Sequence, residues 1–227
     1  MGGRKIIISC EHAGKYIPNA YLKFFEGKDD VLNSHRGWDV GTLEIGKYVA
    51  RILEAPFFFQ KASRLLIEAN RSLDNSELFS EFTAPLSDKD KEHLIATYYR
   101  PYRNEVEKEI ELAISKGETV IHISVHSFTP VLNGVERSVD VGILFDEKRE
   151  LEQQFSIKWK EQLSTELPDL LVMLNLPYNG ADDGFTTYLR TRFEAEKYLG
   201  IELEINQKYA GTPVLEKIKK VLVSTLN

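Results

Sequence analysis

Short apolar runs recur along the chain, and each is bounded by residues that favour turns. The runs are rich in valine, isoleucine, leucine and phenylalanine, a composition typical of buried strands. The pattern predicts strands at residues 5–10, 56–59, 64–69, 119–126, 139–145, 171–174 and 200–206.

Longer segments with helical periodicity lie between these runs. In residues 39–54, small and apolar positions form one stripe and charged positions lie opposite it. Residues 88–116 are rich in glutamate and lysine, and Pro101 should divide them into two pieces because proline lacks an N–H group. Further helices are predicted at residues 148–166, 185–198 and 212–226.

The alternation of strands and helices is typical of the α/β class. We therefore expect one α/β domain over residues 1–227, with a mixed, mostly parallel sheet covered by helices on both faces. Residues 70–87 follow neither periodicity, and an irregular stretch of this length in a compact domain is usually functional or mobile.

The charge balance narrows the class of partner. The formal net charge is −6, whereas a surface that binds nucleic acid needs an excess of lysine and arginine. We expect no nucleic-acid partner, but a small anionic substrate fits, because a few arginines can reverse the electric field inside a pocket.

The lengths of the apolar runs and the number of cysteines argue against a membrane protein, an exported protein and a disulfide-bonded protein. No apolar run reaches the roughly 18 residues of a membrane span, and the run near the amino terminus is too short for a signal peptide. We therefore expect a cytoplasmic protein with no membrane partner. Cys10 is the only cysteine, so an intramolecular disulfide and a cysteine-rich metal cluster are excluded.

Two histidines stand where predicted strands end. His12 follows the run IIISC, and His126 ends TVIHISV, which places both at the sheet edge where α/β proteins bind ligands. Zinc hydrolases commonly add a carboxylate to two histidines and leave one position open for water. The candidates are Glu11, Asp39 and Glu44, although Asp39 also suits the N-cap of the helix predicted there.

A third histidine is a poor candidate for this site. His122 shares a strand face with His126, but four residues of strand separate their Cα atoms by about 13 Å. We interpret His122 as a side chain of the sheet face.

Carboxylates and arginines elsewhere could complete a hydrolase site. In the run GIELEIN, Glu202 and Glu204 share one strand face. Two carboxylates there cost little free energy on an exposed edge strand, but their burial in the interior is costly. A glutamate held on a strand could act as a general base, but an exposed edge strand would explain the same pattern. The segment SRLLIEANRSL holds Arg64 and Arg71, and arginine is suited to bidentate binding of a carboxylate or to a surface ion pair.

Eight segments, in this order, resemble the N-formylglutamate amidohydrolase family. They are CEHAG, HRGWDVGT, SRLLIEANRSL, YYRPYRNEV, SVHSFTPVLNG, VGILFD, NLPYNGADDGFT and IELEINQKY. The resemblance covers most of the chain. It implies a three-layer α/β/α domain similar to the zinc-dependent exopeptidases, with one zinc ion at the carboxyl edge of the sheet.

The resemblance also implies a set of site residues. Zinc would be held by His12, Asp39 and His126, and Glu204 would be the general base. Asn70 and Arg71 would bind a substrate carboxylate, and Arg64 is a further candidate for substrate binding.

The function implied is hydrolysis of the amide of an N-acyl amino acid, with N-formyl-L-glutamate as the leading candidate and formate and L-glutamate as products. Two alternatives stay open. One is another zinc amidase or carboxypeptidase-type hydrolase, and the other is a catalytically silent protein that binds small molecules.

Overall fold

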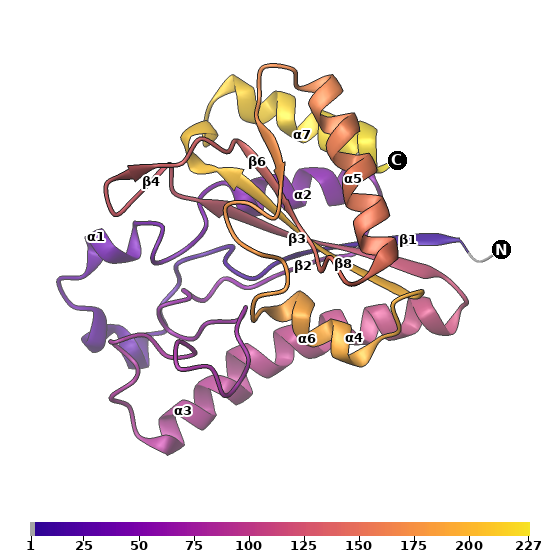
Figure 1. Ribbon diagram of the computed structural model, residues 1–227. Coiled ribbons are helices and arrows are strands. Elements are labelled where there is room, and N and C mark those ends of the chain that lie inside the picture. The colour runs from indigo at the N-terminus through magenta and orange to yellow at the C-terminus, as the bar shows by residue number, and fades with distance from the viewer. Residues whose placement is uncertain (1–2) are drawn as a thin grey trace.

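The computed structural model describes residues 3–227 and centres on a six-stranded sheet (Figure 1). The strand order is β2-β1-β3-β8-β6-β7, and only the β6–β8 pair is antiparallel. The strands are β1 (Arg4–Cys10), β2 (Phe57–Phe59), β3 (Thr119–Phe128), β6 (Val141–Leu144), β7 (Val172–Leu174) and β8 (Tyr198–Asn206). The mixed, mostly parallel sheet predicted from the sequence is confirmed.

Helices cover both faces of the sheet, which makes the three layers visible in Figure 1. On one face lie α2 (Thr42–Ile52), α5 (Glu150–Glu166) and α7 (Pro213–Leu226), and their apolar side chains share a core with the sheet. On the other face lie α4 (Arg100–Ser115) and α6 (Phe185–Arg192). The sheet is therefore buried on both sides, as its nearly continuous apolar strands require.

The predicted helix 88–116 is not broken at Pro101, because residues 88–115 are helical throughout and change only in the type of helix. These residues comprise α3 (Asp88–Leu94) and α4, joined by a π-helical turn, η2 (Ile95–Tyr99). Pro101 stands in the first turn of α4, where its missing N–H group is tolerated. Helix α6 ends at Arg192, earlier than predicted, and β8 begins at Tyr198.

The strand predicted at 64–69 is wrong. These residues form turns, in which the amides of Leu66 and Ile67 donate to the carbonyl of Ser63. The apolar run is buried nonetheless, against η1 (Asn19–Phe25) and the irregular segment 70–87. Its hydrophobicity thus reflects packing in a second small core and not a place in the sheet.

This second core lies beyond the carboxyl end of β1, on the left of Figure 1. The short helix α1 (Asp29–Leu32) lies in the same region, and the sequence pattern did not predict it. A two-stranded ribbon of β4 (Val131–Leu132) and β5 (Val135–Glu136) follows β3. Of the irregular segments near the carboxyl edge of the main sheet, residues 64–71 and 178–183 contribute side chains to the wall of a pocket there.

No helix within residues 3–227 combines the length and the apolar character needed to cross a lipid bilayer.

Candidate active site

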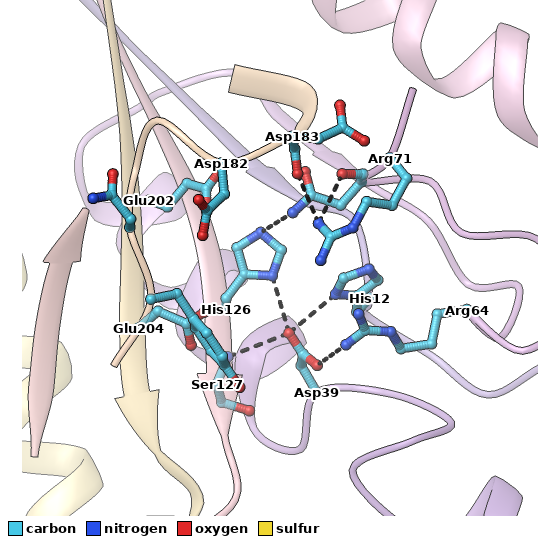
Figure 2. Close-up of a pocket in the computed structure, with 13 residues that line it drawn as sticks. His12, Asp39, Arg64, Arg71, His126, Ser127, Asp182, Asp183, Glu202 and Glu204 are labelled. Carbon is cyan, nitrogen blue, oxygen red and sulfur yellow. Dashed lines mark hydrogen bonds and ion pairs between the residues drawn. The ribbon is translucent and has the colours of Figure 1, made fainter. Parts of the chain in front are cut away.

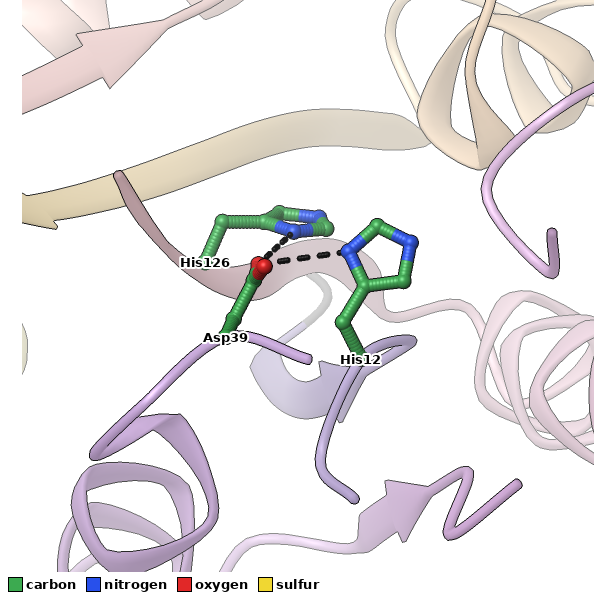
Figure 3. Close-up of side chains that lie close together, drawn as sticks. All are labelled: His12, Asp39 and His126. Carbon is green, nitrogen blue, oxygen red and sulfur yellow. Dashed lines mark hydrogen bonds and ion pairs between the residues drawn. The ribbon is translucent and has the colours of Figure 1, made fainter. Parts of the chain in front are cut away.

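Three buried side chains converge at the carboxyl edge of the sheet (Figure 3). His12 lies two residues past the end of β1, His126 lies within β3, and Asp39 precedes α2. Strands β1 and β3 are parallel neighbours, so their carboxyl ends lie side by side. The amide of Asp39 donates to the carbonyl of His12 at 3.0 Å, which fixes the turn before α2 against the end of β1.

Both histidines direct the same ring nitrogen toward one carboxylate oxygen. Oδ2 of Asp39 lies 3.2 Å from Nδ1 of His12 and 3.0 Å from Nδ1 of His126. One ligand atom from each of the three residues lies within 4.8 Å of the other two. Two imidazole nitrogens and a carboxylate oxygen are a donor set that zinc uses in hydrolases, so these residues fit a metal ion.

The outer ring nitrogens are held by two further carboxylates. Nε2 of His12 is bonded to Glu68, and Nε2 of His126 lies 3.2 Å from Oε2 of Glu11. When a carboxylate accepts the proton of Nε2, the lone pair of Nδ1 is left facing the centre, which is the arrangement that a metal ligand needs. Glu11, a candidate ligand from sequence, thus lies behind His126. Glu68 was not predicted from the sequence, where its only signal was a carboxylate inside an apolar run.

Glu11 belongs to a buried polar network. It accepts hydrogen bonds from Ser9 at 2.8 Å, from Tyr102 at 2.6 Å and from Ser124. Burial raises the pKa of Glu11, but the bonds from His126, Ser124 and Tyr102 outweigh burial and hold that pKa well below its ordinary value. Glu11 is therefore ionised and able to support a neutral histidine ligand.

Asp39 does not cap α2. The N-cap of that helix is Gly41, without a side-chain bond, while the Asp39 carboxylate faces the two histidines. Burial raises the pKa of Asp39, but the two histidines and Arg64 outweigh burial and lower that pKa well below its usual range. The third carboxylate considered from sequence, Glu44, is exposed and pairs with Lys219.

Arg64 is engaged by the site's own carboxylates. Its Nε and Nη2 lie 2.8 and 2.7 Å from Oε2 of Glu68, and its Nη1 lies 3.4 Å from Oδ1 of Asp39. Burial lowers the pKa of Arg64, but these two partners raise it above its ordinary value. The guanidinium offsets the negative charge of carboxylates that surround the histidines.

Glu204 stands beside this group on the next strand. In the ladder between β3 and β8 it pairs with His126, and its side chain is 6% exposed. Its Oε2 has no hydrogen-bond partner within residues 3–227. Burial raises the pKa of Glu204 to about 8, with smaller contributions from Asp39 and Glu202. An unpaired buried carboxyl in a pocket is what a general base would look like before substrate and water arrive.

The remaining predicted residues lie in the same pocket. Figure 2 shows Arg71 near Asp183, and its Nη1 donates to the Asp183 carbonyl at 2.9 Å. The Asn70 side chain accepts from the amide of Phe185 at 2.7 Å, which joins the irregular segment to the start of α6. All seven residues that the sequence analysis selected line this pocket: His12, Asp39, Arg64, Asn70, Arg71, His126 and Glu204.

The chain is similar to known proteins in sequence and in fold. The sequence model of the family described as N-formylglutamate amidohydrolase matches residues 4–210. The structure of the gene product Atu2144 from Agrobacterium tumefaciens is similar at 24% identity and a TM-score of 0.80, over 98% of this chain and 90% of the other. The N-formylglutamate amidohydrolase from Ralstonia eutropha JMP134 shares 16% identity and a TM-score of 0.66, over 100% of this chain and 93% of its own. At these identities both likenesses concern the fold. The chain matches none of the curated proteins.

Proposed function

Because the chain belongs to the N-formylglutamate amidohydrolase family, we propose that it is a zinc-dependent enzyme that hydrolyses the amide of an N-acyl amino acid. The observation that carries the proposal is the convergence of His12, Asp39 and His126 beside the unpaired carboxyl of Glu204. N-formyl-L-glutamate, the compound in the family's description, is the first substrate to test.

The metal would be held by His12, Asp39 and His126. A zinc ion bound there supplies Lewis-acid chemistry, polarising an acyl oxygen and acidifying a water molecule. Glu11 and Glu68 hold the two imidazoles in the orientation that this binding requires.

Glu204 would move the proton. Its carboxylate would accept a proton from the attacking water and pass it to the departing amine nitrogen. Its pKa of about 8 rests partly on the charge of Asp39, so neutralisation of Asp39 by a bound cation would lower that pKa and favour the basic form.

Arg71 and Asn70 would bind the substrate. Arg71 lies on the pocket wall, and its guanidinium is fixed by the carbonyls of Asp183 and Asn70. A guanidinium held in this way is prepared to bind a carboxylate and so to align the amide with the reacting groups.

Zinc content coupled to product release tests the proposal. Protein loaded with zinc should bind close to one ion per chain and release formate from N-formyl-L-glutamate or a related N-formyl amino acid. His12→Ala and His126→Ala should each lose most of the zinc and the activity, because two remaining ligands hold the ion poorly. His93→Ala is the control, since His93 is exposed on α3. Full zinc occupancy in both site variants would contradict the ligand assignment.

A further inference from the structure

The pocket carries more negative than positive side chains. Five carboxylates and two guanidinium groups line it: Asp39, Asp182, Asp183, Glu202, Glu204, Arg64 and Arg71. The charged groups that have no partner within the protein should determine which substrate charges the pocket binds.

Three of these groups are already engaged. Asp39 faces the two histidines, and Arg64 pairs with Glu68 and Asp39. Oδ2 of Asp183 accepts from the amide of Ser72 at 3.0 Å, and this contact connects segment 70–87 to the segment before α6. These charges serve the metal site and the pocket wall.

Two carboxylates keep free capacity. Glu202 accepts one hydrogen bond, from Oγ1 of Thr186 at 2.7 Å, and forms no ion pair within residues 3–227. Asp182 is exposed at the pocket, and its carboxylate has neither a hydrogen bond nor an ion pair in the same part of the chain. Glu204, buried and with no hydrogen-bond partner for its Oε2 within residues 3–227, lies beside them in the pocket.

Arg71 is the positive group left for an anion. Its Nη1 donates to two backbone carbonyls, and the nearest carboxylate, Glu77 at 3.8 Å from Nε, is largely exposed. Figure 2 shows Arg71 on one side of His126 and the two free carboxylates, Asp182 and Glu202, on the other. The guanidinium and the two carboxylates without ion pairs within residues 3–227 thus lie on opposite sides of His126.

We propose that the substrate is an N-acylated basic amino acid, whose α-carboxylate binds Arg71 and whose cationic side chain binds Asp182 and Glu202. This inference rests on the proposed hydrolysis of an N-acyl amino acid and specifies its substrate. The second carboxylate of N-formylglutamate would lie among uncompensated negative charges, which disfavours binding, whereas an ammonium or guanidinium group would compensate them.

A charge series on the intact zinc-loaded protein tests this selectivity. The compounds are Nα-formyl-lysine, Nα-formyl-glutamine and N-formyl-glutamate, which present a positive, a neutral and a negative side chain. We expect kcat/KM to fall in that order, with at least a tenfold difference between the first and the last. Equal values, or a preference for the glutamate compound, would overturn the inference and leave the proposed hydrolysis intact.

Variants show which residues cause the selectivity. The pair Asp182→Asn and Glu202→Gln should reduce the lysine-to-glutamine ratio of kcat/KM at least tenfold. The matched control is the pair Asp169→Asn and Glu161→Gln, exposed acids in and after α5 that do not line the pocket. A ratio that survives the first pair would overturn the assignment of the cation site.

Binding measured without turnover separates the proposed hydrolysis from the proposed preference for a cationic side chain. If the zinc-loaded protein hydrolyses none of the three compounds, the proposed function fails. Isothermal titration calorimetry with the same compounds still decides the charge preference. Tighter binding of the lysine compound would support it, and equal or tighter binding of the glutamate compound would overturn it.

Discussion

Glu202 and Glu204 show how one strand face can hold two carboxylates with different properties. They lie two residues apart on β8, but Glu204 is buried beside His126, whereas Glu202 is half-buried and bonded to Thr186. Burial raises the pKa of Glu204 to about 8. The alternation of the strand predicted that the two share a face, and the burial of Glu204 beside His126 distinguishes it from Glu202 as the candidate general base.

Glu204→Gln should separate proton transfer from metal binding. The amide keeps the shape of the side chain but accepts no proton, so kcat should fall by about 10²- to 10⁴-fold while zinc content and melting temperature are retained. Steady-state kinetics and metal analysis measure both. Glu202→Gln, assayed with a neutral N-acyl amino acid, should lower kcat much less. Zinc loss in the Glu204 variant would make this residue a ligand instead of a base.

Glu68 should affect zinc affinity through His12, without itself being a ligand. Glu68→Gln keeps the size of the side chain but removes the negative charge behind Nε2 of His12, so zinc affinity should fall about 10- to 100-fold. Competition with a chelator measures the dissociation constant. Glu77→Gln, at an exposed position of the following segment 70–87, is the matched control. An unchanged affinity in the Glu68 variant would mean that this contact does not support the ligand.

At the scale of elements, helix α4 supports the substrate-binding loop from behind. Arg103 is buried, and its Nη1 donates to the carbonyls of Ala69 and Arg71 at 3.1 Å each. Its guanidinium carbon lies between 4.3 and 4.7 Å from the ring centres of Tyr99, Phe185 and Tyr188. One side chain thus connects α4, α6 and the backbone that carries Arg71.

Arg103→Met should weaken both the fold and the loop. The Ala69 carbonyl would lose this donor, at a cost of about 1–3 kcal/mol in the free energy of unfolding. Because the backbone of Arg71 is less constrained, KM should rise more than kcat falls. Urea denaturation and kinetics with a carboxylate substrate measure the two effects. Arg100→Met, on the exposed side of α4, should change neither, and a stable Arg103 variant with unaltered KM would exclude the positioning role.

Strands and helices were predictable where the pattern of neighbouring residues in the sequence determines them. The periodicity of residues 119–126 and 200–206 identified the central strands. The ends of the predicted strands placed His12 and His126 at the carboxyl edge of the sheet. The run 64–69 was wrongly predicted to be a strand because it is buried in a second core that distant segments assemble. Glu68 was missed for a related reason, since its partner His12 is 56 positions away and no local pattern connects them.

At the scale of the whole molecule, a buried histidine connects stability to pH. His122 lies in the sheet, 2.8 Å from the Tyr198 hydroxyl and 2.8 Å from Oγ of Ser9. Burial lowers the pKa of His122 to about 4, with Arg190 and His126 also lowering it. The unfolded chain, with an ordinary histidine pKa near 6.5, therefore binds a proton more readily than the folded chain.

Stability should consequently fall as the solution is acidified from about pH 6.5 towards pH 4. The contribution of His122 over that range is on the order of 3 kcal/mol, present in full above pH 6.5 and lost below it. The difference in unfolding free energy between wild type and His122→Gln, measured by urea denaturation at several pH values, should shrink on acidification. His93→Gln, at an exposed position of α3, is the control variant. A constant wild-type difference would contradict the low pKa of His122.

The position of β8 has a consequence for the order in which the site is assembled. It is the last strand of the sheet in chain order, but it lies between β3 and β6 and pairs with both. All three groups that fit a metal come from residues up to 126, whereas the proposed base stands at 204. During synthesis, the three groups that fit a metal therefore leave the ribosome before the proposed base is made. Competence for hydrolysis would then arrive only with the strand that closes the sheet, so an incomplete chain would carry the ion without the proton acceptor.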